Sequence, residues 1–136
     1  MISFNYETLF SLNNEKKIAN WISSVITLEG FKEEEVNYIF CDDAYLHKLN
    51  LEFLSHDTLT DIISFDYSVG KILYGDIFIS IERVKENAAD FKVSFTDELN
   101  RVMVHGVLHY CGYKDKTVED TKLMRDKENY YLHLLA

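Results

Sequence analysis

One stretch of this chain combines a predicted helix, a helix stop and three candidate metal ligands: His105-Gly106-Val107-Leu108-His109-Tyr110-Cys111-Gly112-Tyr113-Lys114-Asp115. On a helix, His105 and His109 lie on one face, one turn apart, because residues i and i+4 are neighbours there. Gly112 is typical of the left-handed C′ position that ends a helix. The chain can then reverse, so that Asp115 returns to the two histidines. The stretch therefore predicts a helix, a tight turn and a metal site where they meet.

These three side chains suit a divalent metal, and zinc above all. Imidazole nitrogens and carboxylate oxygens are ordinary zinc ligands, and a catalytic zinc site keeps three protein ligands and an open fourth position. The bare His-x3-His pair is a weak motif that arises by chance, whereas the added glycine and acidic residue make it more specific. We expect one zinc ion per chain, bound by His105, His109 and Asp115 and used for hydrolysis by metal-activated water.

Gly106, beside the first histidine, allows two interpretations. A glycine inside a helix costs about 1 kcal/mol relative to alanine, so its presence calls for a reason. The missing side chain could admit substrate or a close neighbour beside the metal. It could equally do no more than permit tight packing of the helix.

The helix that carries the histidines is predicted to begin near Thr96. Asp97 and Glu98 would then lie in its first turn, where the helix dipole favours negative charge. Gly112 would end it. Its buried face is expected to contain Leu99, Val102, Met103 and Leu108.

Helices are expected on both sides of this one. A helix from about Ile81 to Phe91, with Ser80 as its cap, precedes it. A further helix is predicted to start at Thr117, where Asp120 three residues later can complete a capping box. This last helix runs nearly to the C-terminus.

Alternation of apolar and polar residues predicts strands in the first part of the chain. Two short runs have the apolar members Ile2, Phe4 and Tyr6, and Val36, Tyr38 and Phe40. Two β-rich segments follow, 62–67 and 72–80, and the turn 68–71 between them suggests an antiparallel hairpin.

Two more helices are predicted among these strands. Asn13 or Asn14 could cap the first, and Gly30 could end it. Its apolar face contains Ile18, Trp21, Ile22, Val25 and Ile26. A short second helix is expected from Asp42 or Asp43. The acidic run 33–35 is interpreted as a solvated loop or helix end, and the polar segment 54–60 as a loop.

Together these elements predict one α+β domain over residues 1–136. It would hold a mixed sheet of about four strands packed with about five helices, because the helical patterns are concentrated late in the chain. The metal site would lie on a central helix and the turn that follows it.

The composition limits the classes of protein that fit. A formal net charge of −9 argues against a nucleic-acid binder that relies on a basic surface. Two cysteines are too few for a disulfide framework. No apolar run reaches membrane-spanning length, and the first residues lack the pattern of a signal peptide. We therefore expect a cytoplasmic protein with reduced thiols and no membrane partner.

Three segments, in the same order along the chain, resemble motifs of the YbeY family of single-domain bacterial endoribonucleases. The signature His-Gly-x-Leu-His-Leu-x-Gly-Tyr-Asp-His is matched at His105, Gly106, Leu108, His109, Gly112 and Tyr113. Leu49-Asn50, Asp57 and residues 60–65 resemble the motif Leu-Asn…Asp-x-Pro-Thr-Asp-Val-Leu-Ser-Phe. Residues 75–80 resemble the strand Gly-Asp-Ile-x-Ile-Ser.

This resemblance implies a zinc-dependent endoribonuclease in ribosomal RNA maturation or ribosome quality control, with ribosomal RNA and ribosomal subunits as partners. The family's third histidine falls on Asp115, which can still bind zinc through its carboxylate. The family's preceding Asp falls on Lys114, and its Pro before Thr-Asp falls on Leu59. Its Arg after Leu-Asn, read as a phosphate or catalytic contact, falls on Leu54. That last departure concerns RNA cleavage more than metal binding.

Several other side chains are candidates for supporting roles. Asp61 and Ser64, with Thr60, could line the site or orient ligands as catalytic residues, although Asp61 could equally cap the junction between loop and strand. Lys114 and Lys116 could contact phosphate. Aromatic residues of the hairpin are expected in its core, with stacking on bases as the alternative: Phe65, Tyr67, Tyr74 and Phe78.

Two other functions stay open. Leu54 and the acidic charge fit a ribosome- or protein-associated metal-binding module with little or no cleavage activity. The spacing also resembles metzincin-like metalloproteases, which carry a Glu right after the first histidine as general base. Gly106 takes that place here and cannot transfer a proton, so RNA hydrolysis is favoured over proteolysis.

Overall fold

The computed structural model describes residues 1–54 and 60–135 and confirms the predicted α+β class. The predicted loop 54–60 falls largely on residues 55–59, with Asp57 and Leu59, which lie outside the described residues. The helices and strands are, in order, β1 (Ile2–Tyr6), α1 (Glu15–Leu28), β2 (Lys32–Cys41), α2 (Asp43–Leu54), β3 (Ile62–Asp66), β4 (Ile72–Ser80), α3 (Ile81–Phe91), α4 (Phe95–Tyr110) and α5 (Val118–Leu135).

The four strands form one mixed sheet in the order β1-β2-β4-β3. The pairs β1–β2 and β2–β4 are parallel, while β3 and β4 form the predicted antiparallel hairpin. Gly70 in the connecting turn has a φ of +58°, which glycine adopts without strain. Because β3 lies at the edge of the sheet beside β4, its first residues come close to the helices on one face.

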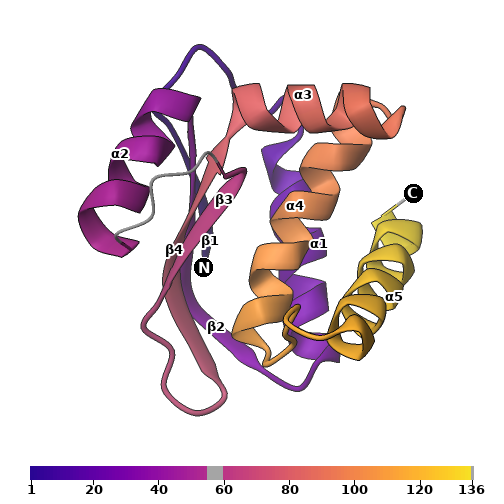
Figure 1. The fold of residues 1–136 in the computed structure, drawn as a ribbon. Helices are drawn as coiled ribbons and strands as arrows, with labels where there is room; N and C mark the ends of the chain where they lie inside the picture. The colour runs from indigo at the N-terminus through magenta and orange to yellow at the C-terminus, as the bar shows by residue number, and fades with distance from the viewer. Residues whose placement is uncertain (55–59, 136) are drawn as a thin grey trace.

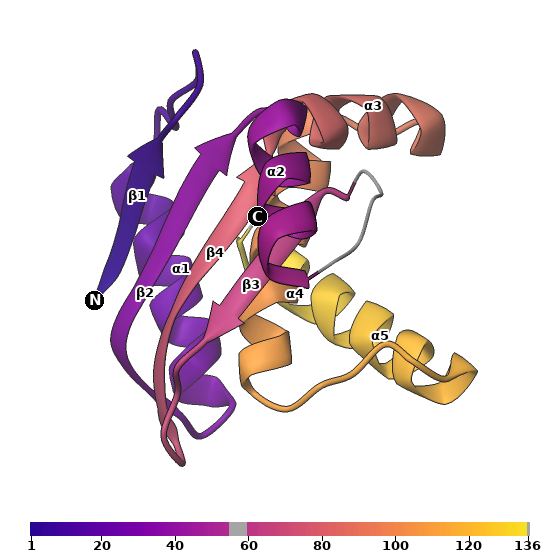
Figure 2. The same cartoon turned by 60° about the vertical axis from the view of Figure 1, so that its left-hand side comes forward.

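The sheet separates a small helical layer from a large one (Figures 1 and 2). Helix α2 contacts β3 and β4 on one face, where Cys41, Leu46 and Ile63 form a small buried cluster. Helices α1 and α4 cover the other face, and α3 and α5 pack against α4. The main core lies between the sheet and these helices, so α4 is enclosed on most sides.

Local sequence signals account for most helix ends. Ser80 accepts a hydrogen bond from the backbone N–H of Arg83 and caps α3, as predicted. The capping box of α5 is also confirmed, because Asp120 N–H donates to Thr117 Oγ1 and Thr117 N–H donates to the Asp120 carboxylate. Helix α4 begins one residue before the predicted Thr96 and is capped by Ser94.

Two sequence-based expectations are wrong. The acidic run 33–35 is solvated but belongs to β2, where it pairs with the extended start of β4. Tyr67 and Tyr74 of the hairpin are 55% and 42% exposed and contact each other edge to face, outside the core. In both places the strands extend beyond the helical layers. The polarity of residues 33–35 and the alternation in the hairpin therefore did not reveal which strand positions the helices cover.

Gly106 lets α4 approach the sheet closely. A Cβ added there would lie 3.0 Å from Cδ1 of Ile62 and 3.2 Å from two carbons of Ile77. Tight helix packing, the second of the two interpretations above, is therefore the one that the structure supports. Among the described residues, no helix is both long and apolar enough to cross a membrane.

Candidate metal centre

The turn after α4 is built by Gly112. This residue has a φ of +99°, and its N–H donates to the His109 carbonyl at 3.0 Å. The Tyr113 N–H donates to the Leu108 carbonyl at 3.1 Å. These two bonds form a Schellman motif, which ends the helix and reverses the chain. The reversal carries Asp115 back toward the last turn of α4, as the sequence predicted.

The structure brings His105, His109 and Asp115 together, and their candidate ligand atoms all lie within 4.8 Å of one another. The Nε2 atoms of His105 and His109 are 3.0 Å apart. Asp115 Oδ2 lies 3.6 Å from Nε2 of His105 and 3.3 Å from Nε2 of His109. Around a tetrahedral zinc ion, atoms at ordinary bond lengths are about 3.3 Å apart. The three atoms therefore form a triangle of the size that one face of such a tetrahedron has.

Hydrogen bonds on the far side of each ring determine which nitrogen faces this triangle. Nδ1 of His109 lies 2.9 Å from the Tyr113 carbonyl oxygen, which can only accept a hydrogen bond. Nδ1 of His105 lies 2.7 Å from Oε2 of Glu128. With both protons on Nδ1, both Nε2 lone pairs point into the triangle, where they repel each other unless a cation lies between them. The donor set thus fits a divalent metal.

Glu128 on α5 is the supporting residue that the sequence analysis missed. It is 4% exposed, and its other oxygen, Oε1, lies 2.9 Å from Nη1 of Arg101 and 3.5 Å from Nη1 of Arg125. Burial raises the pKa of Glu128, but hydrogen bonds from His105 and Arg101 lower it more, so the net pKa lies below its ordinary value. The carboxylate is therefore ionised where it meets the histidine.

A sequence signal for Glu128 existed in the spacing of α5. Met124, Glu128 and Tyr131 recur at helical spacing, and all three are buried. A glutamate within an otherwise apolar stripe requires a buried partner, because an unpaired buried charge is costly. The partner lies on another helix, so the stripe could not name it.

Glu29, at the end of α1, holds the other side of the turn. It accepts a hydrogen bond from the Tyr113 hydroxyl at 2.6 Å and another from the Tyr131 hydroxyl, and Lys127 lies 3.5 Å away. Burial raises the pKa of Glu29, while the two tyrosine hydrogen bonds lower it, and the net pKa lies below the ordinary 4.5. Three helices therefore converge on the segment that carries Asp115.

Two cavities adjoin the candidate ligands, and both are lined by His105 and Asp115. The first, of about 440 Å³, also contains three of the expected residues, Thr60, Asp61 and Ser64, and we call it the Ser64 pocket. Leu54 lines the same pocket, at the position where the resemblance places an arginine. Lys114 and Lys116 are exposed and line neither cavity.

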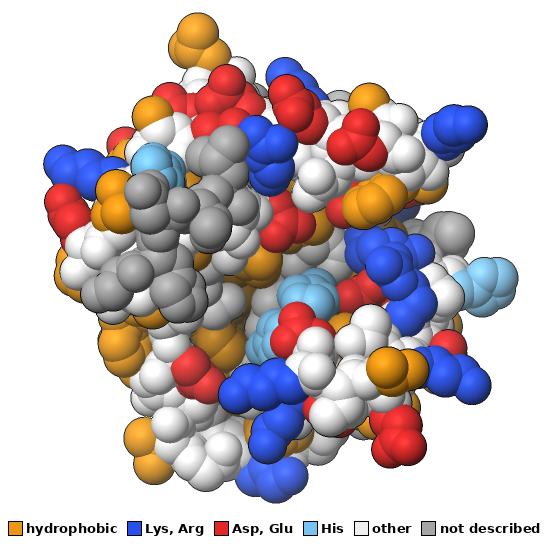
Figure 3. Space-filling view, viewed as in Figure 1, with side chains coloured by type: hydrophobic (Ala, Val, Ile, Leu, Met, Phe, Trp, Pro, Cys, Tyr) orange, Lys and Arg blue, Asp and Glu red, His pale blue; other side chains and the backbone are white. Residues whose placement is uncertain are grey.

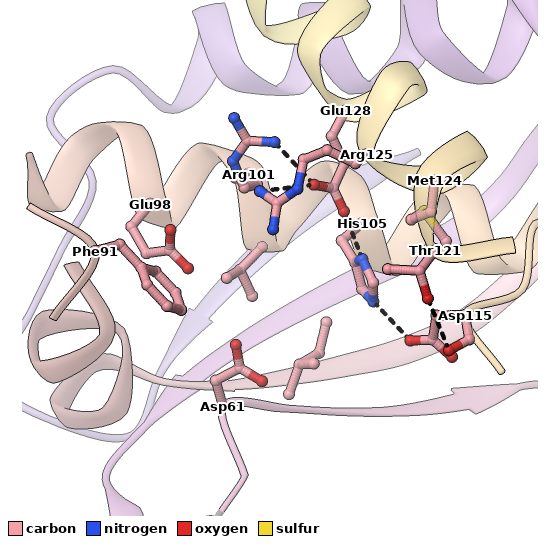
Figure 4. Close-up of a pocket in the computed structure, with 12 residues that line it drawn as sticks. Asp61, Phe91, Glu98, Arg101, His105, Asp115, Thr121, Met124, Arg125 and Glu128 are labelled. Carbon is pink, nitrogen blue, oxygen red and sulfur yellow. Dashed lines mark hydrogen bonds and ion pairs between the residues drawn. The ribbon is translucent and has the colours of Figure 1, made fainter. Parts of the chain in front are cut away.

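The second cavity, of about 340 Å³, lies on the side of α5 and is called the Glu98 pocket (Figure 4). Its walls carry Glu98, Arg101 and Arg125, and Asp61 lines both cavities. In the space-filling view, histidine side chains lie in a hollow beside a carboxylate, with Lys and Arg side chains on either side (Figure 3). The candidate ligands thus lie between two substrate-sized spaces.

Comparisons with known proteins show the family to which the chain is related. A sequence model of the family described as endoribonuclease YbeY matches residues 2–136. A protein named endoribonuclease YbeY from Flavobacterium johnsoniae is 64% identical over 129 residues, which cover 95% of this chain and 93% of the relative. The protein of that name from Flavobacterium psychrophilum is 63% identical, with 98% and 96% covered.

The fold has a solved counterpart as well. The solution structure of TM1509 from Thermotoga maritima matches with a TM-score of 0.71 and 26% identity, over 99% of this chain and 89% of that one. The sequence match therefore extends over nearly the whole chain, and so does the structural one. The chain belongs to the YbeY endoribonuclease family.

Proposed function

We propose that this chain, as a single domain over residues 1–136, is a zinc-dependent endoribonuclease that hydrolyses RNA phosphodiesters in ribosomal RNA maturation. Its relatives carry the name endoribonuclease, which indicates a hydrolase acting on RNA. The observation that carries the metal dependence is the triangle of His105, His109 and Asp115, in which two lone pairs and a carboxylate oxygen converge. We assign ribosomal RNA and ribosomal subunits as partners and the cytoplasm as the site of action.

Under this proposal His105, His109 and Asp115 hold one zinc ion. When bound, zinc supplies Lewis-acid polarisation of a phosphoryl oxygen and acidifies water at its open position. Glu128 keeps His105 in the tautomer that presents Nε2, and the Tyr113 carbonyl does the same for His109. The side chains are thus oriented before substrate arrives, which reduces the reorganisation that the reaction requires.

Arg125 is the side chain that we assign to an RNA phosphate. It lines the Glu98 pocket beside His105 and Asp115, and 57% of its side chain is exposed. Arg101 beside it is held by Glu128 and by Asn129 Oδ1 at 2.8 Å, so it contributes a fixed positive charge. A local arginine pair can attract phosphate although the chain carries a net charge of −9.

Thr60, Asp61 and Ser64 are assigned to the opposite side of the ligands. All three line the Ser64 pocket with both histidines. Burial raises the pKa of Asp61, while hydrogen bonds from backbone N–H groups oppose this shift. A hydroxyl, a carboxyl group and a second hydroxyl can orient the sugar and phosphate of a strand that crosses the ligands.

A second candidate function is a ribosome-associated metal-binding module with little or no cleavage. Leu54 favours it, because this apolar side chain lines the Ser64 pocket where the family resemblance places an arginine. A module of this kind would still need His105, His109 and Asp115 for the metal. The two candidates therefore differ in turnover and agree in metal content.

Proteolysis is not supported. The position after the first histidine holds the general base in metzincin-like proteases, and here it is Gly106. Gly106 lines neither cavity, and a Cβ at this position would lie against Ile62 and Ile77 of the sheet. No proton-transferring group can therefore act from there.

Cleavage of a structured ribosomal RNA fragment, followed on denaturing gels, tests the proposal. Zinc-loaded wild-type protein should cut the RNA, a chelator should stop cleavage, and zinc should restore it. His109→Ala should be inactive, and Lys16→Gln, an exposed position on α1, should retain wild-type activity. Metal-loaded wild-type protein that leaves every RNA intact would favour the non-cleaving module, and zinc-dependent cleavage of a peptide library would favour the protease.

A further inference from the structure

The Glu98 pocket contains a buried acidic group that the proposed chemistry does not use. Glu98 lies in the first turn of α4, is only 6% exposed and lines the cavity. Among residues 1–54 and 60–135, no hydrogen bond or ion pair joins its carboxylate to another group. Buried carboxylates normally have hydrogen-bond donors, because desolvation without them is costly. Glu98 therefore presents to the cavity a carboxylate that no donor of the described residues binds.

Asp61 faces Glu98 across the pocket. Figure 4 shows the two carboxyl groups pointing toward one another, with open space between them. Burial raises the pKa of Glu98 and the neighbouring Asp61 charge raises it further, while the charges of Arg101 and Arg125 oppose this shift only in part. Donors that enter between the two groups would relieve both the desolvation and the repulsion. The pocket is thus prepared for a ligand that presents N–H groups.

The remaining walls suit a nucleotide. Phe91, the last residue of α3, lies beside Glu98 in Figure 4 and is 61% exposed, so one face of its ring can carry a stacked base. His105 and Asp115 line the opposite part of the same pocket. A nucleotide with its phosphate at these candidate ligands could therefore place its base between Phe91 and the acidic pair.

We propose that the Glu98 pocket is a nucleobase subsite, in which Glu98 and Asp61 accept hydrogen bonds from guanine while Phe91 stacks on the ring. This inference rests on the proposed function, since it assigns a base preference to the same RNA-cleaving site. Guanine presents N1–H and its N2 amino group side by side, a pair that matches the two oxygens of one carboxylate. Uracil presents one N–H between two carbonyl oxygens, which a carboxylate repels. The pocket therefore selects the nucleotide next to the cleaved bond.

Binding of nucleoside 5′-monophosphates to the zinc-loaded full-length chain tests this subsite. Guanosine and uridine monophosphate are compared by calorimetry, so that the phosphate is common to both and only the base differs. We expect wild-type protein to bind the guanosine nucleotide about tenfold more tightly, as one bidentate pair of hydrogen bonds allows. Equal affinities for the two nucleotides would overturn the proposal.

Two variants separate recognition from folding. Glu98→Gln keeps the size of the side chain but presents one donor and one acceptor, so the preference should fall to about twofold or less. Asp97→Asn, in the same turn of α4 but exposed and outside this pocket, is the matched control and should keep the preference. An unchanged preference in folded Glu98→Gln would also overturn the proposal.

Phe91→Ala provides an independent measurement, because this exposed side chain can be removed with little effect on folding. It should weaken both nucleotides by a similar factor and leave their ratio unchanged. Wild-type affinity for both nucleotides in this variant would remove Phe91 from the subsite.

Nucleotide binding does not require turnover, so a base preference without RNA cleavage would refute the proposed function and support the subsite. RNA cleavage without any base preference would support the proposed function and refute the subsite.

Discussion

Nδ1 of His105 and Oε2 of Glu128 lie 2.7 Å apart, although the two residues are separated by 23 positions and belong to different helices. This contact links α4, which carries both candidate histidine ligands, to α5 through a buried carboxylate. It determines the tautomer of His105 and so the direction of the Nε2 lone pair. The same carboxylate anchors Arg101, so a single side chain organises both the candidate ligands and the neighbouring positive charge.

We expect Glu128→Gln to weaken zinc binding by about 10–100-fold, as is typical for the loss of a carboxylate partner of a metal-binding histidine. The neutral amide holds the Nδ1 proton less strongly and leaves the Arg101 charge unbalanced. Zinc affinity is measured by competition with a chelating dye. Glu119→Gln, an exposed change in the first turn of α5, is the matched control. Equal zinc affinity in the two variants would show that Glu128 has only a structural role.

Substitutions of Asp115 test the third ligand. Asp115→Ala should lose most zinc affinity, Asp115→His should retain the metal because imidazole also suits tetrahedral zinc, and Asp115→Asn should fall in between. A purely helix-capping role for Asp115 would predict a neutral change to Asn. The cap of α5 is made by Thr117 and Asp120, so that rival is weakened. Wild-type zinc affinity in Asp115→Asn would remove Asp115 from the ligand set.

Arg125→Gln should weaken RNA binding without changing the zinc content. The logarithm of the RNA association constant falls linearly with the logarithm of the salt concentration. Loss of one phosphate contact should make this slope less steep by about 0.7, the value per phosphate for single strands. Zinc content is measured in the single variant Arg125→Gln. RNA binding is measured by fluorescence titration with a single-stranded oligonucleotide at several salt concentrations, comparing protein with and without Arg125→Gln in an inactive His109→Ala background. Lys16→Gln removes the same charge at an exposed position that lines neither cavity, and it should leave the slope unchanged. If RNA affinity falls by a similar factor in both variants, the net charge of the protein explains the loss and Arg125 makes no specific phosphate contact.

Glu29 should make folding stability depend on pH below about 5. Its pKa is lowered in the folded state, so its stabilisation is complete above the unfolded value of 4.5 and is lost as the pH falls through the folded value. Glu29→Gln should therefore be less stable at neutral pH and lose less stability on acidification. Urea unfolding at several pH values measures both effects. Asp90→Asn, an exposed change on α3, should keep the wild-type pH profile.

Gly75→Ala should destabilise the protein by about 1–3 kcal/mol, in the range typical of overpacking. A Cβ at Gly75 would overlap the Phe65 carbonyl and the Tyr110 hydroxyl, which donates to that carbonyl at 2.8 Å. Gly70→Asn is the control, because its φ of +58° suits asparagine and nothing lies within 4 Å. Thermal unfolding compares the two variants. An unchanged melting temperature in Gly75→Ala would mean that β4 and Tyr110 shift at no cost.

The sequence alone determined the local features of the site. The spacing of His105 and His109, the stop at Gly112 and the return of Asp115 all depend on rules that act within about one or two helical turns. For the same reason, the caps of α3 and α5 and the hairpin β3–β4 were predicted correctly. The three-segment family resemblance also indicated RNA cleavage, a function that spacing rules alone do not distinguish from other metal-dependent hydrolysis.

Only the tertiary structure decided which distant groups meet at that site. Glu128 supports His105 from another helix, and Glu98 shares a pocket with Asp61, which lies just before β3. The spacing of α5 marks Glu128 as a buried position, but no local pattern identifies the partner of either glutamate. The extension of β2 through the acidic run 33–35 likewise depends on pairing with β4. Packing against Ile62 and Ile77 also explains Gly106. Such contacts arise from how helices and strands dock, and docking depends on the whole core rather than on any one segment.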